Sequence, residues 1–513
     1  MLRKIGVLGL AVAALSLAAC GSDSPTGTVS TATNRGTLVD DPPLRVTSIN
    51  QSDLVAQLSA SASGQQVLAL AGAPACGVDV YYMKYWTVGP GSSPSPTEVS
   101  GALMVPTGSG AQCSGPLPIL LFAHGIETDS TFNIADVTNP ANTEGPLIAA
   151  VFAAHGYIVV APNYAGFDIS NLGYHPLLNA EQNAADMMDA LTAARAALPN
   201  TFTPATTDSG ELFVSGISEG GYVAMATDKA MQAAGEKVTA TAPISGPYAT
   251  EAFVDAVMFG NVLYGGTAFA PELTTGYQKA YGNLYSQTSD IYSTQFAAGI
   301  ESLVPSPGGA EPLVQQGRLP LALFDSTPPS TGNPTLDAIL APPPNNPLAD
   351  AGFGKPFLIN DTYRIGYVED ALANMDGAVQ QQAAGNVPLA ASPQNTLRQD
   401  LQLNDMRSWA PQMPMLLCGG DQDPLIFYAT NTKTMLAYWS VLVSAGLITE
   451  LDVNAPPQNG NPFAPLQTAF QQQEMQILQS QGEQAYVGSY HTNASAFCTV
   501  GARSFFSQFL PPQ

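Results

Sequence analysis

One serine of this sequence lies where it could act as a nucleophile. Ser218 occupies the centre of the pentapeptide GISEG, which fits the pattern G-x-S-x-G and has no second match in the chain. An apolar run (211–218) precedes a small-residue helical pattern (219–235). A sharp strand-to-helix turn exposes a serine hydroxyl, and the helix N-terminus favours the negative charge that develops in acyl transfer. Side chains at Gly216 and Gly220 would clash in such a turn, so the context favours a nucleophile over an ordinary turn serine.

A serine nucleophile needs a general base, and histidine is the usual one. The chain has four histidines. His124 ends an apolar run as His-Gly, His155 lies at the end of a predicted helix, and His175 opens another. We expect His155 to be structural and His175 to be structural or to face an inserted segment. His491 follows the last predicted strand and a loop, which makes it the remaining candidate.

The base in turn needs a carboxylate that orients it. Asp421 and Asp423 both occur in GGDQDP, directly after an apolar run. Aspartate is also common in turns, so either residue could be only a turn former. The chain has no Cys-x-x-Cys pair, no histidines at ligand spacing and no phosphate-binding glycine loop. We therefore predict no metal site and no nucleotide cofactor.

The elements that must position these residues follow a regular alternation. Apolar runs typical of buried strands alternate with amphipathic stretches typical of helices, which predicts a mostly parallel sheet with helices on both faces. A first pair of strands is expected at 78–88 and 98–105. The later strands are expected at 116–125, 157–166, 211–218, 237–246, 413–424 and 448–454, with helices at 145–156, 177–198, 219–235 and 431–446.

The alternation stops between the serine and the aspartates. Ser218 and Asp423 are 205 residues apart, whereas a strand–helix–strand unit needs only about 30. The surplus, with its helical and proline-rich stretches, predicts a large, mainly helical inserted cap. The expected parts are a signal peptide (1–20), a flexible tether (21–45), a first core part (46–248), the cap (249–408) and a second core part (409–513).

Several of these stretches resemble the α/β-hydrolase superfamily, and most of all its capped secretory lipases and bacterial lipoprotein esterases. They are LLFAHG, YIVVAPNYAGF with GYHPLL, GISEGG and LNDMRSWAPQMPMLLCGGDQDPL. The resemblance implies an α/β-hydrolase fold and the chain order serine, acid, histidine. That order selects His491, and a Gly-x-x-Asp-Pro pattern places the acid at Asp423.

The same resemblance implies an oxyanion site made of backbone N–H groups. One is the N–H of Glu219, and the other lies after the His124-Gly125 motif, where Ile126 is the best candidate. The side chain of Glu219 is expected to point away from the site. The implied activity is hydrolysis of a neutral or apolar carboxylic ester through an acyl-serine, with water as second substrate and no cofactor. The alternatives are a serine peptidase of the same fold and a non-catalytic binding protein.

The N-terminus predicts export. Two cationic residues precede the apolar run Ile5–Ala19, which is too short to span a bilayer comfortably and is typical of a signal peptide. Its end, LAAC, resembles the bacterial lipobox, which implies a lipid on Cys20 and anchoring to a membrane of the cell envelope, in the periplasm or facing outward. The alternative is ordinary cleavage and release.

Four further cysteines remain in the chain. In an exported protein they predict two disulfides in one of three pairings, with four thiols as the alternative. We favour Cys76–Cys113 and Cys418–Cys498, because the second bond would tie the segment of the acid to that of the base.

Charge excludes some partners. Sixteen Lys and Arg against 40 Asp and Glu give a formal net charge of −24. Such a chain repels nucleic acid and strongly anionic substrates. We expect a monomer.

Overall fold

The computed structural model of the protein describes residues 34–60, 62–89, 96–201, 206–344, 352–379 and 387–511. The predicted signal peptide, its lipobox cysteine Cys20 and tether residues 21–33 lie outside this part. Within it, no helix has the length and apolar character needed to cross a membrane.

Nine strands of the described chain form one sheet, in the order β1-β2-β3-β5-β4-β6-β7-β10-β11. The pairs from β1 to β5 are antiparallel and all the others are parallel. This mostly parallel sheet confirms the predicted fold class. The strands are β1 (Leu44–Ile49), β2 (Gly77–Val88), β3 (Pro96–Thr107), β4 (Gly115–Ala123), β5 (Ile158–Pro162), β6 (Thr206–Ile217), β7 (Ala240–Ile244), β10 (Met415–Gly419) and β11 (Ile448–Asp452).

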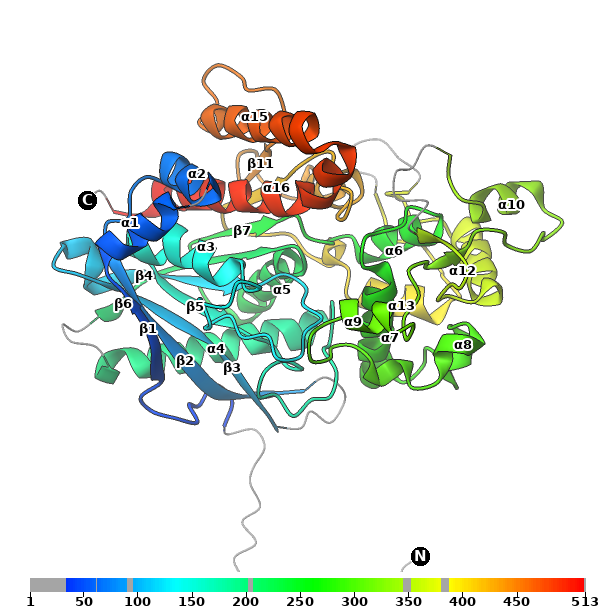
Figure 1. Ribbon diagram of the computed structural model, residues 1–513, viewed down its shortest axis with the longest axis horizontal. Coiled ribbons are helices and arrows are strands. Elements are labelled where there is room, and N and C mark those ends of the chain that lie inside the picture. Colours follow the sequence, from blue (N-terminus) through cyan, green and yellow to red (C-terminus); the bar gives the residue numbers. More distant parts are fainter. Residues whose placement is uncertain are drawn as a thin grey trace, which may run out of the picture. The chain divides into compact units, whose positions relative to one another are not determined.

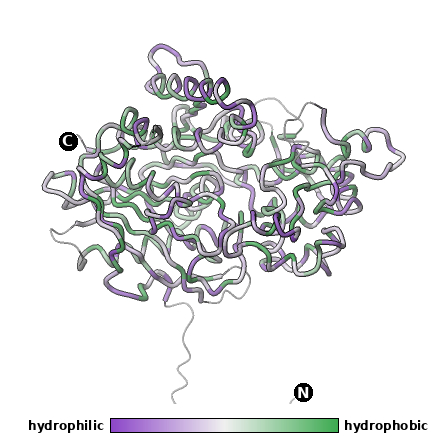
Figure 2. Tube along the Cα trace, viewed as in Figure 1, coloured by the Kyte–Doolittle hydropathy of each residue, from purple (hydrophilic) through white to green (hydrophobic). Residues whose placement is uncertain are grey.

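Helices cover both faces of the sheet (Figure 1). Helices α4 and α5 pack together on one face, while α16 packs on the other face beside α2, α3 and α15. The strands between them are buried and apolar, and they are hydrophobic along most of their length in Figure 2. The helices of this core are α1 (Gln51–Ser59), α2 (Ala62–Ala71), α3 (Glu144–Val151), α4 (Ala180–Thr201), α5 (Glu219–Ala234), α14 (Thr434–Trp439), α15 (Ala464–Gln481) and α16 (Glu483–Phe506).

The segment after β7 forms a mainly helical group, as its lack of strand-like runs predicts (green to yellow in Figure 1). Buried ion pairs connect its helices. The Arg398 guanidinium donates to both carboxylate oxygens of Asp255 at 3.0 and 2.9 Å, and all these side chains are inaccessible to solvent. The elements are α6 (Thr250–Met258), α7 (Gly266–Tyr281), α8 (Thr294–Ala297), α9 (Glu311–Gln315), β8 (Phe324–Asp325), α10 (Pro334–Leu340), β9 (Phe353–Gly354), α12 (Asp361–Ala373) and α13 (Thr396–Leu403).

Short helical turns join these elements. They are the 3-10 turns η1 (Ala111–Cys113), η2 (Ala153–His155), η3 (Thr288–Asp290), η4 (Ile300–Ser302), η5 (Met406–Ser408) and η7 (Ser507–Phe509), and the π-helical turn η6 (Ala429–Lys433).

The N-terminal part of the described chain differs from the prediction. Residues 34–45, expected to belong to the tether, run along β2, where Gly36 N–H donates to the carbonyl of Trp86 at 2.8 Å. Strand β1 then begins at Leu44, before the predicted start of the core. Helices α1 and α2 were not predicted. The chain is therefore packed against the sheet at residues that the composition assigned to a tether.

Candidate active site

The serine lies at the turn between β6 and α5, in a conformation that few side chains adopt. Ser218 has φ 59° and ψ −121°, and its N–H donates to the carbonyl of Ile244 at 2.9 Å. A Cβ on Gly216 would lie 2.2 Å from the carbonyl oxygen of Gly220, and one on Gly220 would lie 2.0 Å from that of Ala123. The two glycines therefore permit the close approach of strand and helix that exposes the hydroxyl.

The loop after β10 and the last long helix bring an aspartate and a histidine together. Asp423 Oδ2 accepts a hydrogen bond from His491 Nδ1 at 2.6 Å, and the aspartate side chain is only 1% exposed. Its other oxygen accepts from the N–H groups of Leu425 and Ile426 at 2.9 and 3.0 Å. A proton on Nδ1 leaves Nε2 free to accept one. Nε2 is buried and makes no hydrogen bond to any described residue.

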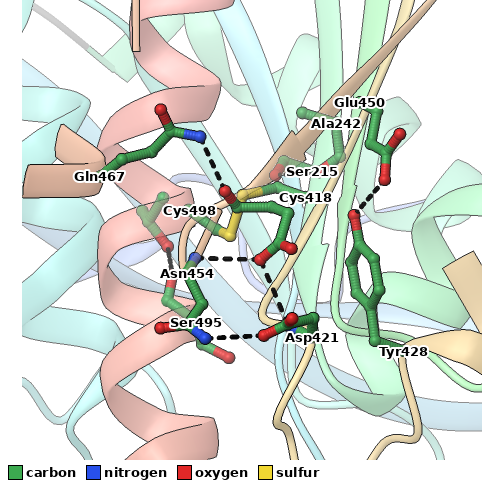
Figure 3. Close-up of a disulfide and its surroundings, with 12 residues drawn as sticks. Ser215, Ala242, Cys418, Asp421, Tyr428, Glu450, Asn454, Gln467, Ser495 and Cys498 are labelled. Atoms are coloured by element: carbon green, nitrogen blue, oxygen red, sulfur yellow. Dashed lines mark hydrogen bonds between the residues drawn. A yellow bond between two sulfur atoms is a disulfide. The ribbon is translucent and has the colours of Figure 1, made fainter. Parts of the chain in front are cut away.

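Asp421, the other candidate for the acid, is directed elsewhere. Its side chain is exposed and accepts from Asn454 Nδ2 at 2.7 Å, as Figure 3 shows. The structure thus brings Asp423 and not Asp421 to the histidine.

One expectation about the base was wrong. His491 does not lie after a loop but inside α16, which also carries Cys498. The disulfide between Cys418 of β10 and Cys498 joins this helix to the strand before Asp423 (Figure 3). Cys76 and Cys113 form the second disulfide, so both bonds are in the favoured pairing.

The expected oxyanion donors lie at the same edge of the sheet. Ala123 of β4 is in register with Gly216 of β6, so the loop after β4 begins beside the serine turn. The N–H of Gly125 is already occupied, because it donates to both carboxylate oxygens of Glu144 at 3.1 and 3.2 Å. The N–H groups of Ile126 and Glu219 make no hydrogen bond to a described residue. They remain available to a ligand.

The motif histidine His124 is structural in its contacts. It is buried, its Nδ1 lies 2.6 Å from the carbonyl of Gly125, and its ring stacks on Tyr164. Burial lowers the pKa of His124 to about 4, so the ring is neutral at pH 7. His155 lies in η2, away from these residues in the chain and in the fold.

Comparisons with known proteins agree with this architecture. The prolyl oligopeptidase family matches residues 146–283. A ligand-bound form of the rice cell wall degrading esterase LipA from Xanthomonas oryzae is 25% identical, covers 92% of this chain and 98% of its own, and superposes with a TM-score of 0.65. A protein from Legionella pneumophila described as a hydrolase is 18% identical over 92% of this chain and 98% of its own, with a TM-score of 0.62. No curated protein sequence matches the chain.

The chain has the α/β-hydrolase fold. The resemblance seen in the sequence is thereby confirmed, and the coarse activity follows: the protein is a serine hydrolase of this fold.

A buried ion pair next to Ser218 of this α/β-hydrolase was missed in the sequence. His175 Nε2 donates to Glu219 Oε1 at 2.6 Å, and its Nδ1 donates to the carbonyl of Ala165 at 3.1 Å. The two side chains are 0% and 2% exposed. Burial alone would lower the pKa of His175, but the charge and hydrogen bond of Glu219 outweigh it and raise the pKa to about 9. The Glu219 side chain, which was expected to point away from the site, thus binds His175 and fixes the first residue of α5.

Burial also raises the pKa of three carboxyl groups near Glu219. The pKa of Glu144 is raised to about 8 and that of Glu127 to about 7. Glu272 of α7 is buried, makes no hydrogen bond to a described residue and has a pKa well above its usual range. Neutral carboxyls lessen the repulsion that a developing oxyanion would meet.

Two cavities of the hydrolase meet at Ser218. The first, which we name the cap cavity, has a volume of about 130 Å³ and lies between the serine turn and α6 and α7. Its lining is almost entirely apolar and includes Phe253, Phe269 and Leu273. The second, the histidine cavity, has about 610 Å³ and is lined by Ser218, His491 and Glu144. Ile126 and Leu425 line both cavities, so a ligand could extend from one to the other past Ser218.

Within the described ranges, no group of three or more His, Cys, Asp or Glu side chains is arranged to hold a metal ion.

Proposed function

We propose that this hydrolase cleaves carboxylic esters through an acyl-serine intermediate. The observation that carries the proposal is the convergence of the strained Ser218 turn and the hydrogen-bonded Asp423–His491 pair on one cavity. Such an arrangement has the groups that nucleophilic serine catalysis needs.

The reaction then proceeds in two displacements. Ser218 Oγ forms a bond to the ester carbonyl carbon while its proton moves to His491 Nε2. The carbonyl oxygen, now negative, accepts from the N–H groups of Ile126 and Glu219. The bond to the alcohol oxygen breaks, and that oxygen takes the proton from His491. Water repeats the sequence on the acyl-serine, which releases the carboxylic acid and restores the serine.

Two observations support an ester as the substrate. The protein of known structure that is 25% identical over 92% of the chain is an esterase. The cap cavity offers an almost entirely apolar surface next to the serine, which suits a neutral acyl chain better than a peptide backbone.

A serine peptidase is the second candidate, because the prolyl oligopeptidase family matches residues 146–283, which include Ser218. The same serine and histidine chemistry cleaves amides as well as esters. An ester, p-nitrophenyl octanoate, and an amide, octanoyl p-nitroanilide, carry the same acyl group. Their relative rates of cleavage distinguish an esterase from a peptidase. Faster turnover of the anilide would favour the peptidase.

The test of the proposal compares two serines of the same turn region. Ser218→Ala should lower kcat on p-nitrophenyl octanoate by about 10⁴-fold or more. Ser215→Ala is the matched control, because the Ser215 hydroxyl is buried in β6 and donates to the carbonyl of Ala242 at 2.7 Å. It should retain activity. Ester turnover by Ser218→Ala at the rate of the wild type would refute the proposal.

We also propose that Cys20 carries a lipid that holds the exported hydrolase at a membrane. The two disulfides support export, because such bonds form and persist outside the cytosol. A labelled fatty acid should be incorporated by the wild type and not by Cys20→Ser. Equal incorporation would refute the anchor and leave the esterase proposal standing.

A further inference from the structure

The histidine cavity continues outward into a third cavity of about 550 Å³, which we name the outer cavity. Gln66 and Leu70 of α2 and Gln473 of α15 line both. A single groove therefore runs from Ser218 along the space between α2 and α15, the two helices seen beside α16 in Figure 1.

The position of the base assigns this groove to one half of the substrate. His491 lines the histidine cavity and not the cap cavity. The group that protonates a departing alcohol must lie within hydrogen-bond reach of its oxygen. The alcohol half of an ester therefore extends into the groove, while the acyl half occupies the apolar cap cavity.

The groove presents side-chain amides that the fold does not use. Four glutamines line the outer cavity, namely Gln66, Gln472, Gln473 and Gln476. Their side chains make no hydrogen bond to another described residue. Helix α15, on which hydrophilic and hydrophobic residues alternate in Figure 2, supplies three of them.

Other glutamines of the same helix are used by the fold. Gln467 Nε2 donates to the carbonyl of Asp452 at 2.9 Å, and Gln471 Nε2 donates to the carbonyls of Asn454 and Ala455, also at 2.9 Å. The glutamines on one face of the helix therefore bind backbone carbonyls of the protein, and those on another face line the groove.

Charge in the groove is low for a chain of formal net charge −24. Among the described residues that line its two cavities, the titratable ones are Glu144 and His491. Burial raises the pKa of Glu144 to about 8, which keeps it mostly neutral at pH 7. The groove therefore has no lysine or arginine for a phosphate and no ionised carboxylate for an ammonium group. Each free amide instead offers two N–H donors and an oxygen acceptor, which suits hydroxyl groups.

We propose that the groove between α2 and α15 is the leaving-group subsite for an uncharged, polyhydroxylated alcohol. The proposal rests on the ester hydrolase function and adds to it the chemistry of the alcohol. Glycerol and a sugar share this chemistry, and the experiment below separates them.

The test varies the alcohol and keeps the acyl group constant. Octanoate esters of glycerol, glucose, ethanol and choline are compared by kcat/KM. At least one of the two polyhydroxylated esters should exceed the ethyl and choline esters by about tenfold, the effect of one to two hydrogen bonds. The better of the two identifies the alcohol. Equal or faster cleavage of the ethyl or choline ester would overturn the proposal.

Variants of the groove glutamines test whether the preference for the alcohol arises in the groove. Gln473→Leu and Gln66→Leu should each lower the ratio of kcat/KM for the preferred ester over the ethyl ester by about fivefold, mainly through KM. Gln479→Leu is the matched control, because Gln479 is exposed on α15 and does not line the outer cavity. An unchanged ratio in both groove variants, or an equal change in the control, would overturn the proposal. If Ser218-dependent cleavage of p-nitrophenyl octanoate persists in that case, the esterase function stands; if it is absent, the function itself fails.

Discussion

The buried pair between His175 and Glu219 makes a prediction that depends on pH. Glu219→Gln removes the negative charge bound to His175 and keeps the backbone N–H that we assign to the oxyanion site. Without the carboxylate, burial becomes the largest influence on the imidazole and lowers its pKa. His175 is then neutral at pH 7, and the hydrogen bond that remains is uncharged.

The magnitude follows from the shift in the pKa of His175. The pair raises it from 6.5 to about 9, and one unit corresponds to about 1.4 kcal/mol, so the pair contributes about 3 kcal/mol to the free energy of unfolding. Because the pKa is raised in the folded state, this contribution is complete below pH 6.5 and disappears as the pH rises through about 9.

Urea unfolding of the wild type and Glu219→Gln measures the effect. The difference in unfolding free energy should be about 3 kcal/mol near pH 6 and below about 1 kcal/mol above pH 9. Glu236→Gln serves as the control, because Glu236 follows α5 and is exposed. A difference that is constant with pH, or that grows toward alkaline pH, would refute the assignment of a charged His175.

Three further predictions concern the site. Asp423→Asn should lower kcat by about 10³- to 10⁴-fold, because the amide no longer selects the correct tautomer of His491; a loss below tenfold in steady-state assays would contradict this role. Replacing both Cys418 and Cys498 by Ala should lower the unfolding free energy by about 4 kcal/mol, given the loop of 80 residues that the bond closes; equal urea midpoints for the two proteins would count against it. Glu144→Ala should lower kcat about tenfold with little change in KM, because the oxyanion loop loses its anchor; a change in KM alone would assign Glu144 to substrate binding instead.

The sheet could be predicted because its strands are buried on both faces and read as continuous apolar runs. The runs around β4, β5, β6, β7 and β10 are such strands. The serine turn could be predicted for the same reason, since strand, glycines and helix are adjacent in sequence. Patterns within a short stretch of sequence sufficed for the strands and for the serine turn, because neighbouring residues determine both.

Helix α16 could not be predicted around the histidine. Its first half contains Gly488, Ser489 and Thr492, which have weak helix propensity, so tertiary packing and the disulfide to β10 must stabilise it. The pair of His175 and Glu219 was missed because its members are 44 residues apart. The helix dipole predicts an acid at the start of α5 but not the direction of its side chain.

The bond between Cys418 and Cys498 has a consequence for when the hydrolase becomes active. It fastens the helix that carries His491 to the strand before Asp423, and it can form only where thiols are oxidised. In the reducing compartment where the chain is synthesised, the alignment of these two groups depends on packing alone. We therefore expect the hydrolase to reach its full activity only after export, once the bond between Cys418 and Cys498 has formed.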